Sequence, residues 1–263
     1  MAAIAEGERR GIGRAERIGT MAIVGGAVAR MRQGGVHTLA VIAGVFGAGW
    51  ALQAAADAAG MDLARGGVTP AYVAYLVGTT LISGLGAALA VRLFLRGPKG
   101  LLRVDRGLLE CAGVMAALTF QFQAISLGRT FVANTLSPAA VAASSYVILV
   151  VYLLAVFVLL RLTLWPVCRL MGRNEVTVAA GWRLMRRATR GLIFGYLIFM
   201  IPFGLVIAVN WGPLMAGGGQ LEGWRQALFL AVGAAYGVAC YAMSATIYAL
   251  RVEAPATVAD VFD

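Results

Sequence analysis

Apolar residues follow one another in six long runs along the chain, and charged residues gather between the runs. The runs cover residues 38–56, 71–91, 108–127, 141–160, 192–211 and 227–250. A run of about 20 apolar residues can cross a hydrocarbon core of roughly 30 Å as an α-helix. The pattern therefore predicts an all-α polytopic membrane bundle with six transmembrane helices. The composition agrees, because 60% hydrophobic and 13% charged residues lie far from the values of a soluble domain.

The third run is the least regular of the six. Gln121 and Gln123 interrupt it, and the stretch RTFVANTLSPAA after it offers no clear end. A helix that crosses the membrane, a short helix and a re-entrant helix are all compatible with this pattern.

The positions of the basic residues predict the orientation. Nineteen of the 22 lysines and arginines fall in the N-terminal arm, the turn after the second run, the connection after the fourth run and the C-terminal tail. The loops on the opposite side hold only Arg65, Arg129 and Arg225. Because basic loops stay in the cytoplasm, both termini are expected there. Topology thus accounts for the net charge of +10, and no nucleic-acid partner is expected.

Three segments describe the organisation that we expect. Residues 1–36 form a cytoplasmic arm with an amphipathic helix, residues 37–250 form the six-helix domain with an interfacial helix at about 175–190, and residues 251–263 form a cytoplasmic tail. The stretch RIGTMAIVGGAVAR has features of a secretory signal, but Gly25 and Gly26 break its apolar core and arginines stand on both sides. An uncleaved interfacial helix is the expectation.

A stripe of arginines precedes the fifth run, in GWRLMRRATR. Its members are Arg183, Arg186, Arg187 and Arg190. At 100° per residue they share one arc of about 100° on a helix, with apolar residues elsewhere. This predicts an in-plane helix whose arginines contact anionic headgroups of the cytoplasmic leaflet. A voltage sensor would need the arginines inside the bilayer, whereas the apolar run begins only after the last of them.

Small residues at four-residue spacing let transmembrane helices approach closely. Such pairs are Gly44 and Ala48, Gly84 and Ala88, Gly191 and Gly195, and Gly233 and Gly237. We expect them to pack inside the bundle, with homodimerisation through one of them as the alternative.

Few residues in the runs could carry chemistry. Glu110 is expected to pair with Arg106 one helical turn earlier. The alternative is a polar intramembrane site, and its candidates are Glu110, Gln121, Gln123 and Asn210. The three cysteines are scattered, His37 is alone at an interface, and no catalytic or metal-binding motif occurs. We therefore expect no enzyme activity, no metal and no cofactor.

The segment RLTLWPVCRLMGRNEVTVAAGWRLMRRATRG at 161–191 resembles a bacterial family of six-span inner-membrane proteins. That family includes the YciC-like proteins and the membrane domain joined to some glycerophosphoryl diester phosphodiesterases. The resemblance rests on Arg161 and Leu162 at the end of a span, Pro166, the polar turn GRNE and a helix with Trp182. Gly181 stands where family members often have serine. The resemblance implies a location in the bacterial cytoplasmic membrane, and it carries over no catalytic activity.

Together these observations favour a non-enzymatic membrane protein with a structural, assembly or envelope-maintenance role. Its expected partners are anionic lipids, other membrane proteins or a second copy of the chain. The alternative is a small transporter or lipid-handling carrier with a polar site among the third to fifth spans.

Overall fold

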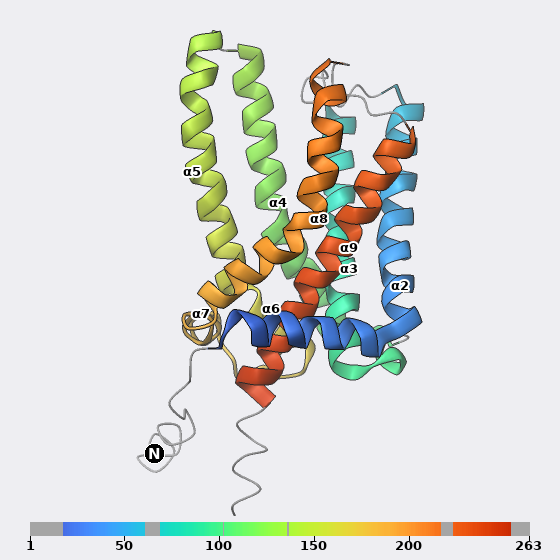
Figure 1. Cartoon of the computed structure of the whole chain (residues 1–263), viewed down its shortest axis with the longest axis vertical. Helices are drawn as coiled ribbons and strands as arrows, with labels where there is room; N and C mark the ends of the chain where they lie inside the picture. The colour runs from blue at the N-terminus through green and yellow to red at the C-terminus, as the bar shows by residue number, and fades with distance from the viewer. Residues whose placement is uncertain (1–17, 61–68, 102, 136, 217–222, 254–263) are drawn as a thin grey trace, which may run out of the picture.

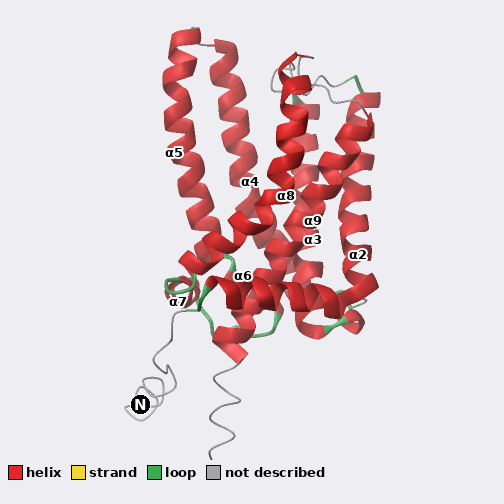
Figure 2. Ribbon diagram, in the orientation of Figure 1, coloured by secondary structure: helices red, strands yellow, loops and turns green. Residues whose placement is uncertain are grey.

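The computed structural model describes residues 18–60, 69–101, 103–135, 137–216 and 223–253. Of residues 126, 129–131, 133, 134, 138–143 and 209–216 it describes the backbone alone. Every regular element in this part of the chain is helical (Figure 2). The long helices are α2 (Thr20–Ala58), α3 (Pro70–Arg96), α4 (Arg106–Thr135), α5 (Pro138–Leu162), α8 (Thr189–Ala216) and α9 (Gly223–Tyr248). The short ones are η1 (Pro98–Gly100), α6 (Leu164–Leu170), α7 (Val178–Met185) and η2 (Ala249–Glu253).

The predicted all-α membrane bundle is confirmed. Among the described residues, six helices are long and apolar enough to cross a membrane. Five of them contain a whole predicted run, and α9 contains residues 227–248 of the run predicted at 227–250. Helix α4 extends over 30 residues, so the third run is not a short helix. Six such helices indicate a multi-pass membrane protein.

Helix α2 has two parts of different direction. Its first part lies across one end of the bundle, and its second part runs along the bundle (Figure 1). The change of direction occurs at Gly35, whose φ of 49° and ψ of −126° suit glycine alone. The Thr38 hydroxyl donates to the Met31 carbonyl at 3.1 Å and so satisfies an acceptor that the kink releases. This kink lies at the boundary predicted between the N-terminal arm and the membrane domain.

The crossing part of α2 packs against the first turns of α8 and the last turns of α9. A Cβ at Gly191 would stand 3.0 Å from the Ile18 carbonyl oxygen, and Gly26 lies directly against Thr246. Arg30 also donates to the carbonyl oxygen of Phe94 at 2.7 Å, at the end of α3. The predicted interfacial helix therefore contacts three other helices of the bundle.

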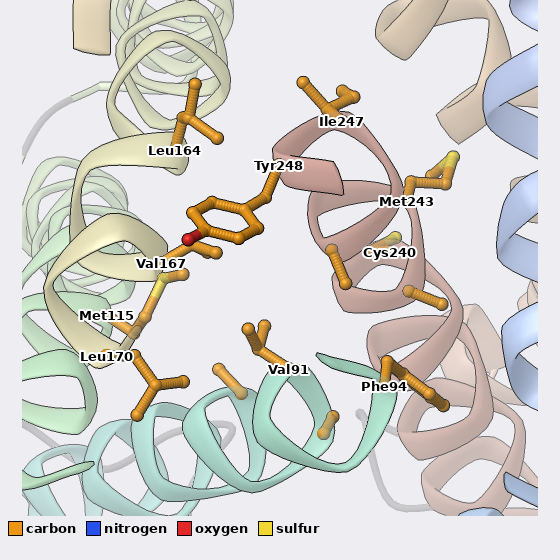
Figure 3. Packing of buried hydrophobic residues seen from close by; sticks show 14 of the residues in the cluster. Val91, Phe94, Met115, Leu164, Val167, Leu170, Cys240, Met243, Ile247 and Tyr248 are labelled. Atoms are coloured by element: carbon orange, nitrogen blue, oxygen red, sulfur yellow. The ribbon is translucent and has the colours of Figure 1, made fainter. Parts of the chain in front are cut away.

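The core gathers at the same end of the bundle as the crossing part of α2. Figure 3 shows side chains from α3, α4, α6 and α9 meeting there around Tyr248, which is 2% exposed. The short helix α6 supplies much of this core, because Leu164, Val167 and Leu170 are 2% exposed or less. We expected only a connection between spans at this place, whereas the structure inserts a buried helix.

The small-residue pairs behave differently from one another. Gly84 lies against the backbone of α4, where a Cβ would stand 2.7 Å from the Cβ of Ala116. In contrast, Gly44 and Ala48 are exposed, and nothing lies within 4 Å of a Cβ placed on Gly44. The expectation that every pair packs inside the bundle is therefore wrong for this pair.

Candidate functional site

Basic side chains collect at the end of the bundle that holds the core, here called the basic end. Fifteen described lysines and arginines belong to it, against four described acidic residues. They come from the crossing part of α2, the end of α3, η1 and the loop after it, the start of α4, the end of α5, α6 and the loop after it, α7 and the turn after it, the start of α8 and η2. At the opposite end, Arg225 is the basic residue whose side chain belongs to the described part of the structure. One end of the protein is therefore strongly positive.

The arginine stripe occupies a different local structure from the predicted one. Helix α7 begins after Thr177, whose hydroxyl accepts the amide of Ala180 at 3.2 Å, and it ends at Met185. A turn follows, and α8 begins at Thr189. The continuous interfacial helix predicted at 175–190 is therefore wrong, because the turn at 186–188 separates α7 from α8.

All four arginines of the stripe are nevertheless exposed. Arg183 lies in α7, Arg186 and Arg187 in the turn, and Arg190 in the first turn of α8. Met185, which stands between these arginines, is 1% exposed within the core. The buried side chains alternate with the arginines, so the stripe stays at the surface although its helix is interrupted.

Arg161 joins the stripe from the last turn of α5. Its guanidinium lies 4.9 Å from the ring centre of Trp182 and 5.3 Å from that of Phe157. It also donates to the Trp182 carbonyl oxygen at 3.1 Å. These contacts fix Arg161 against α7 through cation–π attraction and a charge-assisted hydrogen bond.

Arg92 is a basic residue whose role the sequence did not reveal. Its side chain is fully buried, and it forms an ion pair with Asp105 and a hydrogen bond to the Arg103 carbonyl oxygen. Asp105 also accepts the amide of Leu108 at 2.9 Å at the start of α4. This amide and then Arg92 lower the pKa of the Asp105 carboxyl below its ordinary value. The pair thus closes the α3–α4 turn. In the sequence, an aspartate three residues before an apolar position indicates the start of a helix, and this was the available signal for the role of Asp105.

The predicted polar residues of the spans do not meet in one place. Glu110 forms the expected ion pair with Arg106, at 2.6 Å, near the basic end. Gln121 donates to the Ala155 carbonyl oxygen of α5 at 3.0 Å. Gln123 donates to the Thr79 hydroxyl of α3 at 3.4 Å, on another side of α4.

The fourth candidate, Asn210, has a side chain outside the described part of the structure. The three polar residues that can be placed each bond to a separate partner. The structure therefore does not assemble them into a shared site.

A cavity of about 230 Å³ lies elsewhere, between α2, α3 and α9. Its lining is mainly apolar and includes Gly49, Gly86 and Phe229, with hydroxyl groups from Thr79, Ser83 and Tyr241. Such a cavity suits an apolar chain better than an ion, because few polar groups are available to replace water.

The cysteines are buried and separate, at 5% exposure or less: Cys111, Cys168 and Cys240. His37 is exposed on α2. Within the described ranges, no three His, Cys, Asp or Glu side chains lie together as metal ligands would.

No protein-family model, curated protein or solved structure shows significant similarity to this chain.

Proposed function

We propose that the chain is a non-enzymatic integral protein of the bacterial cytoplasmic membrane, and that it holds anionic lipid headgroups around its basic end. Through these contacts it serves a structural, assembly or envelope-maintenance role, with other membrane proteins or a second copy as further partners. The same proposal includes membership of this chain in the YciC-like family, because its segment 161–191 resembles that family.

The observation that carries this proposal is the asymmetry of charge. Among the described residues, fifteen basic ones against four acidic ones gather where α7, η1 and the crossing part of α2 lie at one end of the spans. An anionic leaflet attracts each such residue by about 1 kcal/mol. The positive-inside rule likewise supports a cytoplasmic basic end, with both termini in the cytoplasm.

Orientation and lipid preference are tested separately. Alkaline phosphatase fused after Asp263 is expected to be inactive in cells, because it folds only outside the cytoplasm; an active fusion would refute the orientation. The purified full chain, titrated with phosphatidylglycerol and with phosphatidylcholine, is expected to retain more phosphatidylglycerol by native mass spectrometry. Equal retention of the two lipids would refute the headgroup role.

The cavity between α2, α3 and α9 favours a second candidate, a lipid-handling carrier. Proteoliposomes with the wild-type chain would then move fluorescently labelled phosphatidylglycerol between leaflets. Gly233→Leu, which places a larger side chain in the cavity lining, would slow that movement. Gly44→Leu is the matched control, because Gly44 faces outward with nothing near its Cβ position. Movement no faster than in protein-free liposomes would rule out the carrier.

A further inference from the structure

We infer that the corner where α5, α7 and α8 meet binds one anionic phospholipid, whose phosphate lies at Arg161 and Arg186 and whose acyl chains follow α5 and α8. The inference rests on the proposed contact with anionic lipid and deepens it, since it assigns one site within the basic end.

The phosphate end of this site combines one arginine that is held in place with a second, exposed arginine. The rings of Phe157 and Trp182 and the Trp182 carbonyl oxygen hold Arg161 in place. Arg186, the residue that follows α7, lies one helical turn after Trp182, whose carbonyl oxygen accepts from Arg161. A guanidinium that is already fixed loses little conformational freedom when it binds a phosphate.

The two arginines lack a carboxylate among the described residues. The ion pairs of the basic end that the described residues form with Asp105, Glu110 and Glu175 use Arg92, Arg106 and Arg173, and not Arg161 or Arg186. The Nε of Arg161 is buried and has no hydrogen-bond partner within the described structure. Two like charges at a membrane surface favour an anion between them, and phosphate oxygens match the donor geometry of guanidinium.

The apolar end of the site is formed in part by exposed apolar residues of α5. Six consecutive residues of this helix, 149–154, are each between 45% and 59% exposed. At 100° per residue, six consecutive positions point in every direction around a helix, so the side of α5 toward α8 is open as well.

Helix α8 also has exposed apolar residues along its length. Phe194 and Leu197 are 58% and 53% exposed, and Ile201 and Leu205 follow at 62% and 64%. The two helices are in contact, and Figure 1 shows them diverging away from α7. Lipid chains can therefore lie along both helices, with the arginine pair at the level of the headgroup.

The arginines and the exposed apolar helices together indicate the chemical class of the ligand. A soluble anion would use only the arginines, and an uncharged lipid would use only the apolar helices. A phospholipid with a net negative charge uses both, because its phosphate and its acyl chains are covalently joined.

The test compares two exposed arginines of the basic end. Arg186→Gln removes one charge from the corner, and Arg103→Gln removes one charge from the α3–α4 turn, which belongs to neither α5, α7 nor α8. The full chain in detergent is delipidated and titrated with phosphatidylglycerol, and binding of the first lipid is measured by native mass spectrometry. We expect Arg186→Gln to weaken this binding about fivefold and Arg103→Gln to change it less than twofold. Arg161→Lys, which keeps the charge but loses the planar stacking, is expected to weaken it as well.

Three other outcomes would each contradict a defined part of the inference. Equal losses for Arg186→Gln and Arg103→Gln would show diffuse attraction, which overturns this site but leaves the proposed headgroup role intact. A wild-type chain that binds phosphatidylcholine as tightly as phosphatidylglycerol would overturn both. Displacement of the bound lipid by millimolar glycerol phosphate would show a site for soluble phosphate and overturn the lipid as ligand.

Discussion

The buried ion pair of Arg92 and Asp105 allows a quantitative prediction. Asp105→Asn removes the negative charge but keeps an oxygen that can accept the Leu108 amide. The buried guanidinium of Arg92 then loses its counter-charge. Removing one partner of a buried pair costs about 3–5 kcal/mol, and because the Asp105 side chain is 28% exposed, screening by water reduces this to about 2–3 kcal/mol.

The reverse substitution should cost less. Arg92→Met replaces the buried guanidinium with an apolar side chain and leaves Asp105 partly solvated and still bonded to α4, so we expect about 1 kcal/mol. The free energy of unfolding from an SDS titration in mixed micelles measures both. The control is Arg106→Gln, because Arg106 is 92% exposed and its pair with Glu110 should contribute less than about 1 kcal/mol.

The acid range adds a second readout for the same pair. Since the folded-state pKa of Asp105 lies below its ordinary value of 3.8, its stabilisation is complete above that value and is lost as the pH falls through the lower, folded-state pKa. The wild-type chain should therefore lose more stability than Asp105→Asn in acid. If Asp105→Asn cost no more than Arg106→Gln, or if acid affected both chains equally, the pair would not stabilise the turn.

The remaining predictions concern packing, backbone conformation and burial. Gly84→Ala should destabilise the bundle by about 1–3 kcal/mol through overlap with α4, whereas Gly44→Ala should change the same SDS unfolding free energy little; equal effects would contradict the close approach. Gly35→Ala should cost about 1–3 kcal/mol because its positive φ strains an L side chain, and Gly25→Ala, at an open helical position, is the control; a neutral Gly35→Ala would mean that the kink differs. The buried thiols should resist maleimide in detergent and react in SDS, while a cysteine at Met21, which is 78% exposed, should react in both; rapid native labelling of all three would contradict their burial. These thiols are Cys111, Cys168 and Cys240.

The pattern of apolar runs was enough to predict the membrane bundle. A segment of about 20 apolar residues has no stable alternative to a helix in lipid, because every backbone polar group must be satisfied within the segment. The spacing of opposite charges likewise predicted a single contact, the Arg106–Glu110 pair one turn apart on α4. The basic segments were also identifiable, and the structure brings them to one end of the bundle.

The candidate site was only partly predictable. The stripe from Arg183 to Arg190 was identified, but its separation by a turn depends on how α8 must enter the bundle. The contribution of Arg161 depends on Trp182, which is 21 residues away in the chain. No periodicity connects residues so far apart, so their contact could not be inferred from spacing.

The sequence by itself determined which segments are apolar and helical, because those properties depend on neighbouring residues and on the length of each run. Only the tertiary structure decided which side chains meet. It buried Arg92 among charged residues that look alike in the sequence, placed α6 in the core, and left one small-residue pair, Gly44 and Ala48, facing outward. The physical reason is that burial and ion pairing depend on helices that are distant in the chain, and their crossing points are fixed by packing of the whole bundle.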